Sequence, residues 1–267
     1  WTQLMNFWGL NKNEFRRIIL TIFLLFILAA NFAWFNPRPE RIPAYRISEK
    51  IPLFWQYDSD SRLFTNIVLN YPYYWGNVNQ DIERPVVPTL VKAFTVIVHP
   101  LTTSLNLDLD PQILRIGESA MGYYLVTYLS LFIFGILGYK FLRDFFGFDK
   151  DSSFLAIALI LTNHFTIYLA HTWHTYFVQL VVPLFLTYMF VDASRKYTNR
   201  KLIIYSLLSG IFLMMKPVYA VYATIYTFML YKREYKKTLA SLFLLLVPMA
   251  IWAIIIGRLG FNPIWVV

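Results

Sequence analysis

Long apolar runs dominate this chain, and they restrict what it can fold into. A helix needs about 20 mostly apolar residues to cross the hydrocarbon core of a bilayer. Runs of this kind occupy residues 18–35, 119–139, 152–170, 174–191 and 238–256, and two shorter ones occupy residues 202–215 and 218–231. Each run is typical of a helix in lipid, so we predict an all-α polytopic membrane protein.

The composition supports a lipid environment. Hydrophobic residues make up 58% of the 267 positions and charged residues only 15%, which is too little charge to cover a soluble globule of this size. The first run is followed by Asn36-Pro37-Arg38-Pro39 and not by a small-residue cleavage site. It is therefore interpreted as a retained transmembrane helix and not as a signal peptide.

Basic residues predict the orientation. Of the 24 Lys and Arg residues, 14 lie in the short segments 1–17, 140–151, 192–201 and 232–237. The positive-inside rule makes these segments cytoplasmic. The net charge of +9 is then a consequence of topology and of anionic lipid headgroups, and gives no indication of nucleic acid binding.

The two short runs test the number of helices. If residues 202–231 formed one span kinked at Pro217, the basic segment 232–237 would lie outside, against the positive-inside rule. Two spans that meet in an outer turn keep every basic segment in the cytoplasm. We therefore expect about seven transmembrane helices, divided into a cytoplasmic tail (1–17), a first helix (18–35), an extracytoplasmic loop (36–118) and a six-helix membrane bundle (119–267).

The loop of residues 36–118 is too short for a large core of its own and is expected to lie on the bundle. Two interfacial helices are predicted in it, at residues 61–70 and 89–98. The second begins after Pro88 and is expected to end at His99-Pro100, so that at about ten residues it cannot span. Between them, Tyr71-Pro72-Tyr73-Tyr74-Trp75-Gly76 suits either the headgroup layer or the face of a sugar.

Two groups of polar residues on the outer side are candidates for chemistry. Asp58 and Asp60, in Tyr57-Asp58-Ser59-Asp60-Ser61-Arg62, can serve as a general base, as ligands of a divalent metal or as a helix N-cap. His171 and His174 lie at an outer turn, where they can share a metal, contact a phosphate or form a polar interfacial turn.

Several motifs occur in an order that resembles the GT-C type of integral membrane glycosyltransferase. A first helix is followed by the outer-loop acids, then by Glu83-Arg84-Pro85-Val86-Val87-Pro88 before an apolar helix, and late in the chain by Ser209-Gly210 to Lys216-Pro217. The resemblance covers roughly residues 15–256. It implies transfer of a sugar from a polyprenyl-phosphate carrier to an acceptor on the extracytoplasmic face of an inner or plasma membrane.

The resemblance also implies roles for single residues. Asp60 matches the family's loop acid best and Asp58 second, with a divalent metal as an optional cofactor. A phosphate carrier leaves as a weak base, so that one carboxylate and a few cations suffice, and Arg62, Arg84 and Lys216 are the candidate phosphate partners. The alternatives are a catalytically inactive GT-C-like subunit of a larger membrane complex and a transporter, although transporters place ionisable residues or broken helices near the midplane.

Overall fold

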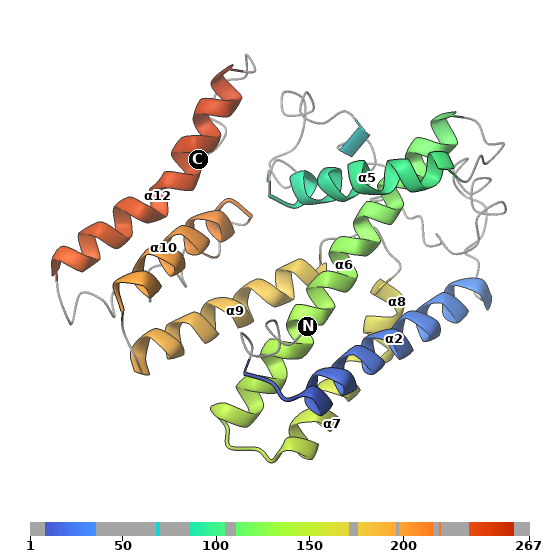
Figure 1. Cartoon of the computed structure of the whole chain (residues 1–267), viewed down its shortest axis with the longest axis horizontal. Helices are drawn as coiled ribbons and strands as arrows, with labels where there is room; N and C mark the ends of the chain where they lie inside the picture. Colours follow the sequence, from blue (N-terminus) through green and yellow to red (C-terminus); the bar gives the residue numbers. More distant parts are fainter. Residues whose placement is uncertain are drawn as a thin grey trace. The chain divides into compact units, whose positions relative to one another are not determined.

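The computed structural model describes residues 9–35, 68–69, 86–104, 111–170, 176–195, 198–215, 219 and 235–258 (Figure 1). Within these ranges every extended regular element is a helix. The helices are α2 (Lys12–Phe35), α5 (Val86–Ser104), α6 (Pro111–Asp144), α7 (Lys150–Leu161), α8 (His164–Ala170), α9 (Tyr176–Arg195), α10 (Asn199–Leu213) and α12 (Tyr235–Arg258). The all-α prediction is confirmed for this part of the chain.

Three helices of the described part are long and apolar enough to cross a membrane. They are Val86–Ser104, Leu114–Asp144 and Lys236–Ile255. Large apolar side chains also lie exposed along the helices, among them Phe23 on α2 and Phe243 on α12, with exposed fractions of 59% and 71%. Such surfaces are too apolar for water and match lipid, so the chain is a helical membrane protein.

The chain divides into two compact units, which are described separately. Unit 1 comprises Trp1–Leu69 and Leu90–Val181, and unit 2 comprises Asn70–Thr89 and Val182–Val267. In unit 1, α2 packs against α6, α7 and α8. Their shared core contains Ile18, Leu25, Leu131, Ile136 and Leu161, all nearly inaccessible to solvent.

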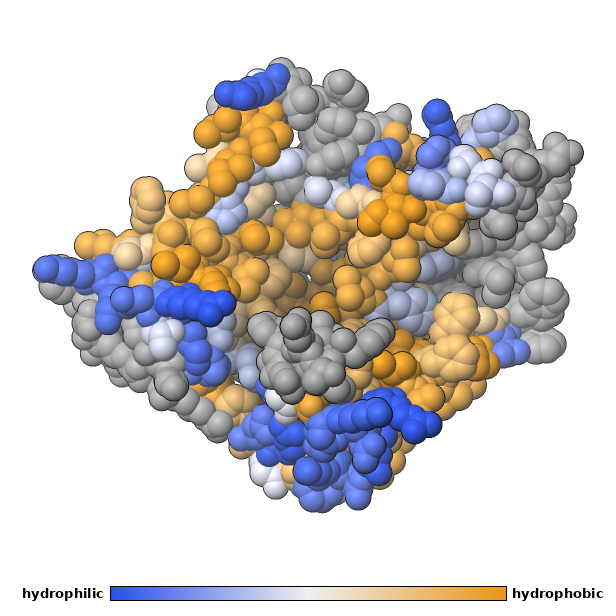
Figure 2. Space-filling view, viewed as in Figure 1, coloured by the Kyte–Doolittle hydropathy of each residue, from blue (hydrophilic) through white to orange (hydrophobic). Residues whose placement is uncertain are grey.

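The ends of α2 and α6 give unit 1 a polar face. The start of α2, the end of α6 and the start of α7 lie together, because Glu14 contacts Arg143 and Lys150. Figure 2 shows hydrophilic residues gathered there, at the bottom of the view, and hydrophobic residues over much of the helix flanks. This arrangement puts the basic residues at the start of α2 and the basic segment 140–151 at the same end of the unit.

The prediction for residues 89–98 was wrong in length. Helix α5 has 19 residues and continues through His99 and Pro100 to Ser104. Proline lacks the N–H that would bond the carbonyl four residues earlier, here that of Val96. The Thr103 hydroxyl donates to the His99 carbonyl at 2.9 Å, which is a local side-chain bond in the last turn, and the helix continues past Pro100 without the missing backbone bond.

Helix α5 contacts α6 near the N-terminal end of α6. A Cβ on Gly122 would lie 2.7 Å from the Val91 carbonyl oxygen and 2.7 Å from the Thr95 hydroxyl, so only glycine allows this approach. Figure 1 shows α5 crossing α6 close to where α6 begins. With 19 residues α5 is long and apolar enough to cross a membrane, so the prediction that this segment is too short to span was wrong.

The predicted span 152–170 is broken. Helix α7 ends at Leu161 and α8 begins at His164. The side chain of Asn163 caps the new turn, because its Oδ1 accepts from the Thr166 amide at 2.9 Å. The Thr166 hydroxyl donates to the Ile160 carbonyl at 2.9 Å. The sequence pattern missed the break because apolar residues continue on both sides of it.

In unit 2, helices α10 and α12 lie side by side and run in the same direction. Ser206 and Ser241 share a hydrogen bond of 2.7 Å, and four residues further along each helix Gly210 meets Leu245. A constant offset between the contacts means that the helices are parallel (Figure 1). Both helices therefore start at the same end of unit 2, and the chain crosses back between Met214 and the start of α12.

The closest contact between these helices is at Gly210. A Cβ there would lie 2.2 Å from the Leu245 carbonyl oxygen, and a separation under 3.0 Å requires the backbone to shift. Small residues of this kind let helix backbones approach in a membrane, where apolar side chains gain little over lipid. Gly210, which belongs to the Ser209 to Pro217 motif, thus has a packing role.

We predict that Gly210→Ala destabilises the protein, although alanine favours a helix over glycine by about 1 kcal/mol. Displacement of the helix should lower the free energy of unfolding by about 1–3 kcal/mol, as overpacking does in other cores. Thermal unfolding in detergent micelles measures this change. Gly257→Ala on α12 is the control, because no atom lies within 4 Å of its added Cβ. Equal effects of the two substitutions would contradict the packing role.

The parallel arrangement predicts that residues at the starts of α10 and α12 lie on one side of the membrane. The chain has no cysteine, so single cysteines can be introduced cleanly. Arg200→Cys and Lys236→Cys should react with an impermeant maleimide from the same face of sealed vesicles, and Tyr73→Cys from the other. Reaction of the first two from opposite faces would refute the arrangement.

Candidate functional site

The residues singled out from the sequence as candidate site residues all lie outside the described residues. They are Asp58, Asp60, Arg62, Arg84, Lys216, His171 and His174. The sequence context of Arg84 is informative even so, because α5 starts two residues after it. Among the polar groups that the structure does describe, two clusters lie at the two ends of α6.

The apolar part of α6 separates its two polar ends. No charged residue occurs between Ser119 and Tyr139, whereas Glu118 precedes this stretch and Lys140 and Arg143 follow it. At 1.5 Å per residue, Glu118 and Arg143 are about 37 Å apart along the axis, slightly more than the ~30 Å of a hydrocarbon core. The two ends therefore fit the two headgroup layers of one bilayer.

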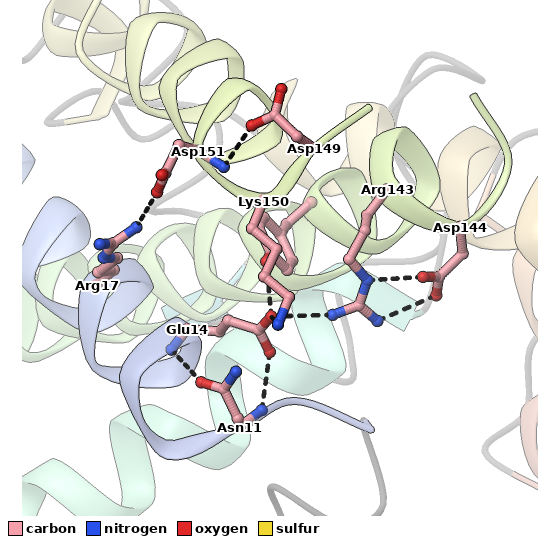
Figure 3. Close-up of polar contacts among 9 residues, drawn as sticks. Asn11, Glu14, Arg17, Arg143, Asp144, Asp149, Lys150 and Asp151 are labelled. Carbon is pink, nitrogen blue, oxygen red and sulfur yellow. Dashed lines mark hydrogen bonds and ion pairs between the residues drawn. The ribbon is translucent and has the colours of Figure 1, made fainter. Parts of the chain in front are cut away.

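At one end, Asn11 and Glu14 form a reciprocal cap on α2 (Figure 3). The Glu14 amide donates to Asn11 Oδ1 at 2.9 Å, and the Asn11 amide donates to Glu14 Oε2 at 2.8 Å. Asn11 is the N-cap and Glu14 the third helical residue, which is the spacing of a capping box. The local sequence thus both starts α2 and fixes the Glu14 carboxylate.

The same carboxylate ties α2 to α6 and α7. Glu14 Oε1 accepts from the Tyr139 hydroxyl at 2.8 Å and from Arg143 at 3.2 Å, and Lys150 Nζ lies 3.8 Å away. Arg143 also bonds Asp144, so its charge is shared between two acids. Figure 3 shows these side chains converging from the three helix ends.

The environment of Glu14 favours its ionised form. Burial by itself raises the pKa of Glu14, but the amide of Asn11, the hydroxyl of Tyr139 and the charges of Arg143 and Lys150 together outweigh burial and lower the pKa below its usual range. A carboxylate that accepts from its own N-cap and from α6, with Lys150 of α7 nearby, links the three helix ends.

A second contact joins α2 and α7 nearby. Arg17 donates to Asp151 at 2.6 Å, and Asp149 caps α7 by accepting from the amides of Asp151 and Ser152. The Arg17 and Asp151 side chains are 52% and 83% exposed. Exposed ion pairs contribute little to stability, so the contacts of Glu14 contribute most of the stabilisation between these helix ends.

At the other end of α6, Glu118 makes a smaller cluster with α5. Its side chain is only 5% exposed, and its Oε1 lies 2.5 Å from the Thr102 hydroxyl and 2.8 Å from Nδ1 of His99. The His99 side chain is 59% exposed. A buried carboxylate that holds an accessible imidazole is an arrangement used for proton transfer.

Sequence reasoning missed this cluster. Glu118 was taken as the last residue of the loop, and His99 as a helix end. Two signals were present: Glu118 is an acid at the edge of an apolar run, where charge is costly unless it is paired, and His99 lies beside a proline that the helix continues through. The pairing across 19 positions is visible only in the structure.

The described residues contain no group of three or more His, Asp or Glu side chains placed to hold a metal ion. The loop acids Asp58 and Asp60, with which a divalent metal was associated, are outside them. Comparison with protein-family models, with curated proteins and with solved structures gives no match.

The lowered pKa of Glu14 predicts an acid-sensitive fold. The ionised carboxylate stabilises the folded protein above the usual glutamate pKa, and this stabilisation is lost as the pH falls through the lower folded-state pKa. Glu14→Gln should lower the free energy of unfolding at pH 7 by about 1–2 kcal/mol and flatten its decline toward about pH 4. Thermal unfolding in detergent across this range measures both effects.

Asp151→Asn is the matched control for this measurement, because it removes a carboxylate from the same end of unit 1 but from an exposed pair. It should change the unfolding midpoint little at any pH. If Glu14→Gln keeps the wild-type unfolding midpoint and the wild-type pH dependence, the Glu14 contacts do not stabilise the association of the helices.

Proposed function

We propose that this chain is a membrane glycosyltransferase of the GT-C type, which moves a sugar from a lipid-phosphate carrier to an acceptor on the extracytoplasmic face. The observation that carries the proposal is the order of acid pair, Arg84-Pro85-Val86-Val87-Pro88 and apolar helix in one outer loop. That apolar helix, α5, is fastened to α6 at the end opposite the basic cluster of Glu14, Arg143 and Lys150.

The proposed topology has about seven spans with the N-terminus in the cytoplasm. It is supported within unit 1 by the common end of the basic start of α2 and the basic segment 140–151. Within unit 2 it is supported by the parallel course of α10 and α12, which brings the basic residues at the starts of both helices to one end. A single kinked span over residues 202–231 would make these two helices antiparallel.

The chemistry of such a transferase is simple to assign by residue type. The acceptor hydroxyl replaces the lipid phosphate at the anomeric carbon, so the site must activate the hydroxyl and hold the departing phosphate. Asp60, with Asp58 beside it, is assigned to the acceptor hydroxyl, as a base or as a ligand of a divalent cation. Arg62, Arg84 and Lys216 are assigned to the phosphate.

We predict that Asp60→Asn lowers sugar transfer about a hundred- to ten-thousand-fold, because a group that activates the acceptor contributes that much to the rate. The assay uses the chain in lipid nanodiscs with a panel of radiolabelled polyprenyl-phosphate hexoses and follows loss of label from the lipid. Asp81→Asn, a neutralised acid of the same outer loop, is the control and should retain activity.

Two outcomes of this assay would contradict the proposal. A wild-type chain that releases label from none of the lipid-linked hexoses would favour a structural subunit of a larger membrane complex. Transfer by wild type that persists in the Asp58→Asn, Asp60→Asn double variant would keep the activity but remove the acid pair from the site.

A further inference from the structure

The Glu118 carboxylate is buried, and both of its described contacts reach one oxygen. Thr102 and His99 approach Oε1 at 2.5 and 2.8 Å from one face of α5, while the carboxylate itself comes from α6. Both residues lie within helices, although Pro100 follows His99, and Gly122 allows the helices to approach closely one turn further along α6. The histidine ring is therefore positioned by rigid elements, as a site for chemistry requires.

The carboxylate determines which nitrogen of His99 carries the proton. An ionised carboxylate can only accept hydrogen bonds, so the nitrogen that faces it, Nδ1, must be the donor. In a neutral imidazole the other nitrogen, Nε2, then has a free lone pair and is the basic atom. Because the ring is mostly exposed, that lone pair belongs to an accessible side chain.

The location of the pair fits the outer headgroup layer. Glu118 lies at the end of α6 opposite the Glu14 cluster, and in the proposed topology that end is extracytoplasmic. The loop with Asp58 and Asp60 emerges on the same side of the membrane in this topology. An imidazole is also a stronger base than a carboxylate, which makes it the better acceptor for the proton of a hydroxyl.

We propose that His99, positioned by Glu118, is the residue that accepts the proton of the acceptor hydroxyl during sugar transfer. The inference rests on the proposed function. The hydroxyl oxygen forms a bond to the anomeric carbon, and the bond from that carbon to the phosphate oxygen breaks with its electron pair. The hydroxyl proton moves to Nε2 of His99, and the lipid phosphate leaves as an anion.

In this assignment the acid pair of the loop orients the hydroxyl or holds a cation, and Glu118 is a positioning residue that stabilises the imidazolium. Glu118→Gln tests it, because a glutamine amide can also donate to Nδ1. The ring is then free to adopt the other tautomer, in which Nε2 carries the proton and has no lone pair.

The first experiment observes the imidazole ring of His99 directly and does not require sugar transfer. The chain has four histidines, so a variant with His164, His171 and His174 replaced by glutamine leaves His99 alone. Nitrogen-15 NMR of this variant in nanodiscs should show the Nδ1–H tautomer, and diethyl pyrocarbonate should modify Nε2 readily. Adding Glu118→Gln should shift the ring toward the Nε2–H tautomer and slow the modification. An Nε2–H tautomer with Glu118 intact would overturn the proposal.

The second experiment uses transfer from the polyprenyl-phosphate hexose accepted by wild type. His99→Gln should reduce the rate about a hundredfold or more, and added imidazole should restore part of it because it supplies the missing proton acceptor. His164→Gln is the matched control and should leave the rate unchanged. Asp60→Asn should gain nothing from imidazole, since its role is a different one.

The two proposals fail in distinguishable ways. Wild type without transfer contradicts the proposed function, while the NMR result still decides whether the pair has the basic Nε2. Transfer by wild type together with full activity of a folded His99→Gln protein overturns the role of His99 and leaves the proposed function intact. A loss of activity that imidazole does not restore would show that His99 has only a structural role.

Discussion

Backbone hydrogen bonding in an apolar solvent is the constraint on which the described structure depends. Lipid offers no partner for a free carbonyl or amide, so each group must be satisfied within the chain. Regular helices do this by themselves, and at their irregular points side chains take over. Between α7 and α8, Asn163 accepts from the Thr166 amide and the Thr166 hydroxyl donates to the Ile160 carbonyl.

The same reasoning explains where charge is placed. An unpaired charge inside the bilayer is costly, and α6 carries its charged residues only beyond its apolar stretch. The two ends are used differently. Glu14 is surrounded by partners from its own N-cap, α6 and α7, and links the ends of these helices. Glu118 holds one imidazole that is mostly exposed, and the proposed proton transfer is assigned to that end.

Helix association in unit 2 shows what replaces the hydrophobic effect in lipid. Burying an apolar side chain against another helix gains little when the alternative is lipid, so close backbone packing and hydrogen bonds decide the contact. Gly210 and the Ser206–Ser241 bond provide these for α10 and α12. The parallel course of α10 and α12 follows from these two contacts.

The sequence by itself determined the helical class, because an apolar run of span length can be counted without knowing its neighbours. Residues 18–35, 119–139 and 238–256 lie within α2, α6 and α12 as predicted. The break at Asn163 and the Glu118–His99 pair depended on which side chains meet. Sequence spacing does not contain these distances, and only the tertiary structure decided them. A hydroxyl, amide or carboxylate can form a hydrogen bond with a distant group only where the packed helices bring the two within hydrogen-bond reach.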